Sequence, residues 1–156
     1  MRTFAFPATT ALTALSLWLI FAQASSAGDL SGVALSGIVA NAETHYVLKE
    51  KSGGLVGLKG DIDACYRSLA KNASASRIVY CIALDDITTR SNTVYGPGAE
   101  HIFPYFSAKE FDARATQAAM KAGVHDAKAF KAKILASADP AARRAAAAQH
   151  VNDAAP

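Results

Sequence analysis

Residues 61–95, DIDACYRSLAKNASASRIVYCIALDDITTRSNTVY, contain both cysteines of the chain on two segments with helical periodicity. Before the turn, apolar residues at helical spacing form one face, comprising Leu58, Ile62, Cys65 and Leu69. After the turn, a broader apolar surface comprises Ile78, Cys81, Ile82, Leu84 and Ile87. Both cysteines are therefore expected to face a core.

The segment between these two helices predicts a tight connection. Residues 71–76 contain no large apolar side chain, and Ser74 or Ser76 can cap the second helix. We expect an antiparallel αα-hairpin, in which inward-facing cysteines come within reach of a disulfide. The bond would contribute about 3 kcal/mol by closing its loop. Two buried free thiols are the alternative in a reducing compartment, whereas export favours a Cys65–Cys81 disulfide.

Residues 1–27 have the pattern of a cleavable secretory signal peptide. Arg2 supplies the positive charge, residues 11–24 form an uncharged and mostly apolar stretch, and small residues follow. Cleavage is expected after Ala27, with Ala24 as the second choice. An uncleaved anchor is the alternative, but the strongly apolar core is shorter than the ~20 residues that a spanning helix needs. We expect no membrane association once the signal is removed.

This pattern predicts an exported protein, in the bacterial periplasm or alternatively in the extracellular space. The short signal and the alanine-rich body favour a bacterial host. An oxidising compartment also suits the paired cysteines.

The charges are close to balance. The 156 residues include 16 Lys and Arg and 13 Asp and Glu, giving a formal net charge of +3 at pH 7. These charges are scattered along the chain, so composition gives no reason to expect nucleic acid or an anionic membrane as a partner. Much of the 51% hydrophobic content is alanine, which predicts close helix packing around a thin core.

The flanking segments also have helical patterns, separated by breaks. A helix capped by Asp29 or Ser31 is expected to end at the Ser-Gly-Gly of residues 52–54. Residues 55–60 are interpreted as either a loop or a weak helical turn, because two further glycines lie there.

Ser107 and Glu110 form an S-x-x-E capping box, and Phe106 and Phe111 occupy the staple positions beside it. This is the clearest local signal in the chain, and it predicts a helix over residues 108–122.

Asp126 can cap a following helix, which we expect to stop at Asp139-Pro140. The same proline can begin one more helix, which would pack weakly because the tail has almost no large apolar residue.

These patterns together predict an all-α fold, because no segment shows the alternation of a half-buried strand. We expect a small bundle of four to six helices joined by one disulfide. The signal peptide occupies residues 1–27, one helical domain occupies residues 28–151, and residues 152–156 form a frayed tail.

The aromatic segment 102–106, IFPYF, lies between a Gly-Pro-Gly breaker and the capped helix. It could close the end of the helical core. Alternatively it is a recognition loop, because clustered aromatic residues are common interface anchors. Its candidate partner-binding residues are Phe103, Tyr105 and Phe106.

No motif specifies a reaction, a cofactor or a metal. The four histidines lie in separate segments without metal-ligand spacing, and they are His45, His101, His125 and His150. Asp85 and Asp86 are adjacent and point about 100° apart on a helix, so they do not form a two-carboxylate site. We expect them to be solvated, with Asp86 paired to Arg90, although one of them could point inward as a polar anchor.

The stretch from the first cysteine onward resembles the small periplasmic lysozyme-inhibitor domains of the LprI type. The resemblance covers residues 65–95 and rests on Cys65, Cys81, Asp85, Asn92 and Tyr95. It departs from the pattern in the wider spacing of the cysteines and in lacking a second helix-hairpin signature. It implies inhibition of a cell-wall hydrolase, and no functional residue is carried over from it.

We therefore predict a non-enzymatic module that binds or inhibits another exported protein. The alternative is a periplasmic enzyme or metal-binding protein that uses His45, His101, His125 or the Asp85/Asp86 pair. The oligomeric state is not predicted by any pattern in the sequence.

Overall fold

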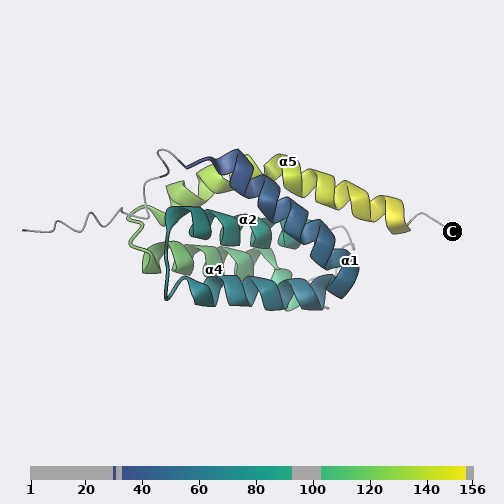
Figure 1. The fold of residues 1–156 in the computed structure, drawn as a ribbon, viewed down its shortest axis with the longest axis horizontal. Coiled ribbons are helices and arrows are strands. Elements are labelled where there is room, and N and C mark those ends of the chain that lie inside the picture. Colours follow the sequence, from purple (N-terminus) through teal and green to yellow (C-terminus); the bar gives the residue numbers. More distant parts are fainter. Residues whose placement is uncertain (1–29, 31–32, 93–102, 154–156) are drawn as a thin grey trace, which may run out of the picture.

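The computed structural model describes residues 30, 33–92 and 103–153, and only the backbone of residues 149–153. The predicted signal peptide and its candidate cleavage sites lie outside the described residues, as do Tyr95, His101 and Ile102. Every regular element of the described chain is helical, and the helices pack into a bundle (Figure 1). The predicted all-α fold is confirmed.

Four α-helices and one short 3-10 helix follow one another along the described chain. They are α1 (Leu35–Ser68), α2 (Ala75–Asn92), the 3-10 helix η2 (Pro104–Phe106), α4 (Ala108–Lys121) and α5 (Ala127–Asp153). Helix α5 thus includes residues 152 and 153 of the predicted frayed tail.

Helix α1 is bent into two arms at Gly54. This glycine has φ 55° and ψ −158°, a backbone conformation that residues with a Cβ rarely adopt. Figure 1 shows the first arm, residues 35–53, running outward and the second arm, residues 55–68, running back. The chain therefore reverses at the predicted glycine stop. Residues 55–60, which we interpreted as loop or weak turn, are helical.

The second arm of α1 and helix α2 form the predicted αα-hairpin. The backbone N–H of Arg77 donates to the Ser74 hydroxyl at 3.3 Å, so Ser74 is the residue that caps α2. Cys65 and Cys81 form a disulfide across this hairpin, with their Cα atoms 5.7 Å apart. The predicted pairing is confirmed.

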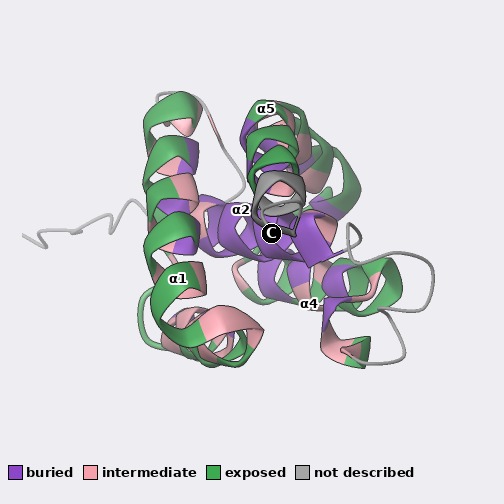
Figure 2. Ribbon diagram, turned by 90° about the vertical axis from the view of Figure 1, so that its right-hand side faces the viewer, coloured by how far each residue is buried: buried purple, intermediate pink, exposed green. Residues whose placement is uncertain are grey.

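Helix α2 is the centre of the bundle. Figure 2 shows it buried among α1, α4 and α5. All residues from Ile78 to Asn92 except Tyr80 and Arg90 are buried, including six polar ones. A helix surrounded on all sides must be buried around its whole circumference. Its polar residues therefore need hydrogen-bonding partners inside the protein. One such partner, Arg114 on α4, also lines the candidate site described below.

Helix α4 begins at the predicted capping box. The Ser107 hydroxyl accepts a hydrogen bond from the Glu110 backbone N–H at 3.3 Å, and the flanking Phe106 and Phe111 are buried. Asp126 likewise caps α5, accepting from the Ala129 N–H at 2.8 Å. Both predicted helix starts are confirmed.

The predicted stop at Asp139-Pro140 is wrong, since α5 continues through Pro140 to Asp153. The predicted weak packing of the tail is wrong as well. Ala141, Ala142 and Ala145 are buried, because alanine allows α5 to approach α1 and α2 closely. Packing of this face outweighs the local cost of a proline inside the helix.

Candidate binding groove

A groove of about 600 Å³ lies between the C-terminal end of the α1 second arm and helix α4. We call it the basic groove. Its lining residues come from two segments and are Asp63, Tyr66, Arg67, Leu69, Ala70, Lys71, Ala73, Arg114, Gln117, Ala118, Lys121 and Ala122. This volume falls in the range of about 300 to 1,000 Å³ that is typical of ligand sites.

Helical periodicity explains the composition of each wall. On α4, residues 114, 117, 118 and 121 recur at spacings of three and four, which brings them onto one face, and Ala122 follows at the C-cap of the helix. On the opposite wall, Arg67 and Lys71 are likewise four positions apart, at the end of the second arm and the start of the turn. The disulfide at Cys65 fixes this arm to α2 within the segment that forms the wall.

The groove has a basic rim. Arg67, Lys71 and Lys121 are exposed, and within the residues that the structure describes none of their side chains forms a hydrogen bond or a salt bridge. The acidic residue in the lining, Asp63, is already bound by the Lys59 ammonium and by the Tyr105 hydroxyl, each at 2.7 Å. Against the effect of its burial, the pKa of the Asp63 carboxyl group is lowered by its hydrogen bonds and by the nearby charges of Lys59 and Arg67. The rim cations are therefore available to a partner.

A buried ion pair supports the groove from below. Arg114 donates from Nε and Nη2 to the two carboxylate oxygens of Asp85, at 3.0 and 2.7 Å. The Tyr66 hydroxyl donates to the same carboxylate at 3.0 Å. Asp85 is fully buried, and this burial raises the pKa of its carboxyl group while the Arg114 hydrogen bonds partly offset the rise.

The third donor of Arg114 fixes the aromatic segment. Arg114 Nη1 donates to the Tyr105 backbone carbonyl at 2.7 Å, and the guanidinium carbon lies 3.8 Å from the centre of the Tyr105 ring. Of the three candidate partner-binding residues, Phe106 is 2% exposed and belongs to the core. Phe103 and Tyr105 pack against the core and are partly exposed, so a contact with a partner remains a prediction for these two alone.

The expected solvation of Asp85 and Asp86 is wrong. They are 0% and 3% exposed, because α2 is covered on all sides. The predicted pairing of Asp86 with Arg90 is present at 2.9 Å, and Arg90 also reaches Asp139 on α5 at 2.7 Å. The other Asp86 oxygen is buried and has no hydrogen-bond partner among the residues that the structure describes.

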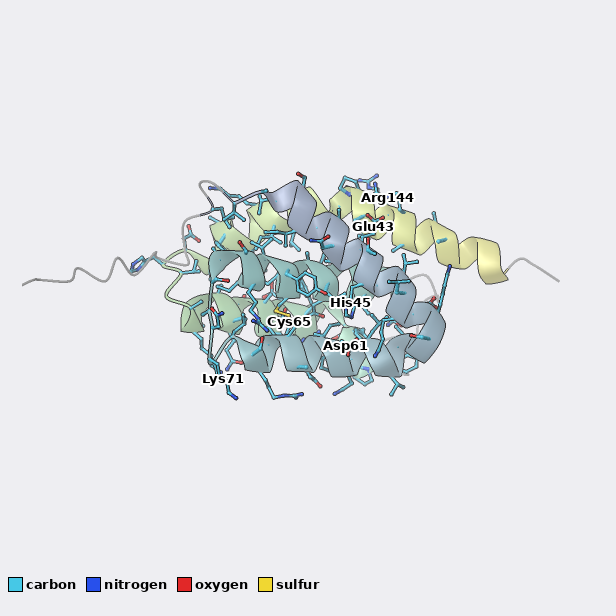
Figure 3. All side chains as sticks on the ribbon, viewed as in Figure 1. Glu43, His45, Asp61, Cys65, Lys71 and Arg144 are labelled. Atoms are coloured by element: carbon cyan, nitrogen blue, oxygen red, sulfur yellow. A yellow bond between two sulfur atoms is a disulfide. The ribbon has the colours of Figure 1, made fainter. Side chains whose placement is uncertain are left out.

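The candidate catalytic residues that the structure describes do not converge. His45 Nε2 lies 2.9 Å from Asp61, and Lys49 lies 3.3 Å from the same carboxylate, which joins the two arms of α1. Figure 3 shows this contact well separated from Lys71, at the other end of the second arm. His125 is exposed.

Within the described part of the chain, no hydrogen bond or ion pair links His45 or His125 to the aspartates of α2. His101 and the side chain of His150 lie outside that part. The described residues also contain no cluster of three or more His, Cys, Asp or Glu side chains arranged to hold a metal ion.

The residues of the groove were not identified from the sequence. The spacings of Arg67 with Lys71 and of Arg114 with Lys121 are visible there, but such spacings are common on solvated helix faces. Only the packing of α4 beside the second arm of α1 brings the two sets together.

Comparison with protein-family models, with characterised proteins and with solved structures finds no match to this chain. None of the described helices is both long enough and apolar enough to cross a membrane.

Proposed function

We propose that this protein is an exported, non-enzymatic binding module and that the basic groove is its binding site. The observation that carries the proposal is the set of three exposed cations, Arg67, Lys71 and Lys121, whose side chains form no hydrogen bond or salt bridge within the described residues. Small apolar residues lie between them. This combination favours an anionic partner that also buries apolar surface.

The polar groups beneath the groove support a binding role over a catalytic one. The donors of Arg114 are directed to Asp85 and to the Tyr105 carbonyl, and the Tyr66 hydroxyl is directed to Asp85. Burial also raises the pKa of the Tyr66 hydroxyl well above its ordinary value. These groups bind one another and form a fixed floor, which suits a preformed recognition surface.

Export is supported by the pattern of residues 1–27 and by the disulfide between Cys65 and Cys81. The intact mass of protein recovered from the periplasm tests it, since a mature chain that starts near Gly28 is expected. A retained signal segment would contradict that part of the proposal.

The resemblance of residues 65–95 to LprI-type domains suggests a cell-wall hydrolase as the binding partner. An assay of lysozyme activity with and without the purified protein tests this suggestion directly. If lysozyme activity is unchanged, the suggested partner is wrong, while the groove itself is tested separately below.

The alternative function is a periplasmic enzyme centred on His45. The observation in its favour is the contact of His45 with Asp61, a pairing that can orient an imidazole for proton transfer. Turnover of a substrate that is lost in His45→Ala, with the fold retained, would establish this alternative.

Affinity capture from an envelope extract of the native host tests the proposed site. The bait proteins are the wild type, the variant Lys71→Glu/Lys121→Glu, and the charge-matched control Lys128→Glu/Lys133→Glu. Lys128 and Lys133 are exposed on α5 and do not line the groove. We expect the groove variant alone to lose a partner, with an unchanged thermal unfolding transition. Equal capture by all three proteins would contradict the proposal.

A further inference from the structure

We infer that the basic groove receives an acidic segment of a protein partner, in which two carboxylates flank an aliphatic side chain. This inference rests on the proposed function and specifies the chemistry of its partner. The arrangement of charge and apolar surface in the groove, and the existing bonds of Arg114, support it.

The cations lie on both walls. Arg67 and Lys71 belong to the end of the α1 second arm and the following turn, and Lys121 belongs to α4 on the other side. A partner that uses both walls therefore needs at least two acidic groups, placed on either side of its body. A single carboxylate would leave one wall without a counter-charge.

The lining between the cations is apolar and small. Leu69 and Ala118 are each 8% exposed, and Ala70, Ala73 and Ala122 extend this surface. Residues of this size leave room for an aliphatic side chain of the partner, whose burial on binding is favourable. The segment that fits both features has the order acidic, aliphatic, acidic.

The existing bonds of Arg114 favour a protein segment over a free small diacid. Sites that capture a free carboxylate commonly use a guanidinium that binds both of its oxygens. The Arg114 fork is already directed to Asp85, and its remaining terminal nitrogen is bound to the Tyr105 carbonyl. A free diacid would meet only the rim cations, including the exposed Arg67 guanidinium, and solvent-exposed contacts of this kind contribute little to affinity. A protein partner can add contacts beyond the groove.

The test is an NMR titration with three probes: a capped Gly-Glu-Leu-Glu-Gly peptide, its Gly-Gln-Leu-Gln-Gly analogue, and free glutarate. We expect the acidic peptide to bind and to shift the amide signals of Ala70 and Gln117, with a dissociation constant below about 1 mM. The glutamine analogue and glutarate are expected to bind at least about tenfold more weakly, because they lack the charges or the aliphatic side chain.

Variants test where the peptide binds. Lys71→Glu/Lys121→Glu should weaken the acidic peptide by at least about tenfold, because reversal turns attraction into repulsion. The control Lys128→Glu/Lys133→Glu should bind like the wild type. Equal binding of both peptides, or of glutarate and the acidic peptide, would overturn the inference. The inference would also be overturned if a single-stranded oligonucleotide bound more tightly than the acidic peptide and if the groove variant no longer bound it.

The outcome for the proposed function is separate. If the groove variant loses its captured partner while the acidic peptide binds nowhere, the groove is a binding site and the acidic-segment inference is wrong. If neither the capture nor the peptide depends on Lys71 and Lys121, both proposals are wrong.

Discussion

Arg114 on α4 binds both carboxylate oxygens of the fully buried Asp85 on α2, at 2.7 and 3.0 Å. The pair crosses the bundle between positions 29 residues apart in the chain. It joins α4 to the central helix, and its Arg114 member lines the groove. The interaction that positions the groove is therefore also an interaction of the core.

Removing either Asp85 or Arg114 alone should lower the stability of the fold. In Asp85→Asn, the Arg114 side chain, which is 17% exposed, loses its counter-charge. We expect the free energy of unfolding to fall by about 3 to 5 kcal/mol, the cost of leaving a buried charge without its partner. Denaturant unfolding of Asp85→Asn, Arg114→Met and the double variant measures this. The double variant should lose clearly less than the sum of the single losses, and strict additivity would show that the two residues act independently.

Asp86 should make the protein less stable as the pH rises. Burial raises the pKa of its carboxyl group from 3.8 to about 6, although Arg90 lies beside it. Because this folded pKa exceeds the unfolded value, the contribution of Asp86 is fully present below about pH 4 and is lost as the pH rises through about 6. The difference in unfolding free energy between the wild type and Asp86→Asn isolates this effect from the other carboxylates.

We expect the wild type to lose about 3 kcal/mol relative to Asp86→Asn between about pH 4 and pH 7. Urea unfolding at several pH values measures this difference. Glu50→Gln, a change at a partly exposed carboxyl group of α1 that caps no helix, serves as the matched control. A difference that does not vary with pH would show that Asp86 does not titrate in this range.

The disulfide should stabilise the fold substantially. Cys65 and Cys81 are separated by 16 positions, and loss of a closed loop of this size lowers the unfolding free energy by about 3 kcal/mol. The variant Cys65→Ala/Cys81→Ala and the reduced wild type are both expected to unfold at lower denaturant concentration. Alkylation followed by intact-mass measurement verifies the redox state. An unfolding midpoint equal to that of the oxidised protein would contradict this prediction.

Pro140 should be destabilising where it stands. It lies inside α5 and is exposed, so its replacement removes no core contact. Pro140→Ala restores a backbone donor and relieves the clash with the preceding turn, which should stabilise the protein by about 1 to 3 kcal/mol. Thermal and urea unfolding measure the change. A loss of stability would mean that the helix requires the proline at this position.

Local signals in the sequence predicted much of the fold correctly. The apolar spacing placed both cysteines toward the core, and the caps at Ser107 and Asp126 mark real helix starts. The predicted stop at Pro140 is wrong because tertiary packing outweighs the local effect of a proline on the helix. Ala141 and Ala145 are buried after the proline, and their packing stabilises the helix there.

The candidate site could not be predicted in the same way. Asp85 looks like a surface residue until its partner Arg114 is known, and nothing local links the two. The charges of Arg67, Lys71 and Lys121 are scattered along the chain, and only the packed helices gather them around one groove. The aromatic composition of residues 102–106 suggested a recognition loop, yet Phe106 belongs to the core.

Site-specific photo-crosslinking in cells of the native host tests the central claim most directly. A photoreactive residue is placed at Gln117 in the groove, at Phe103 in the aromatic segment, or at exposed Lys133 on α5 as the control. We predict a discrete crosslinked partner from Gln117 that disappears when Lys71→Glu/Lys121→Glu is added, and none from Lys133. A partner captured from Phe103 or Lys133 but not from Gln117 would contradict the groove as the binding site.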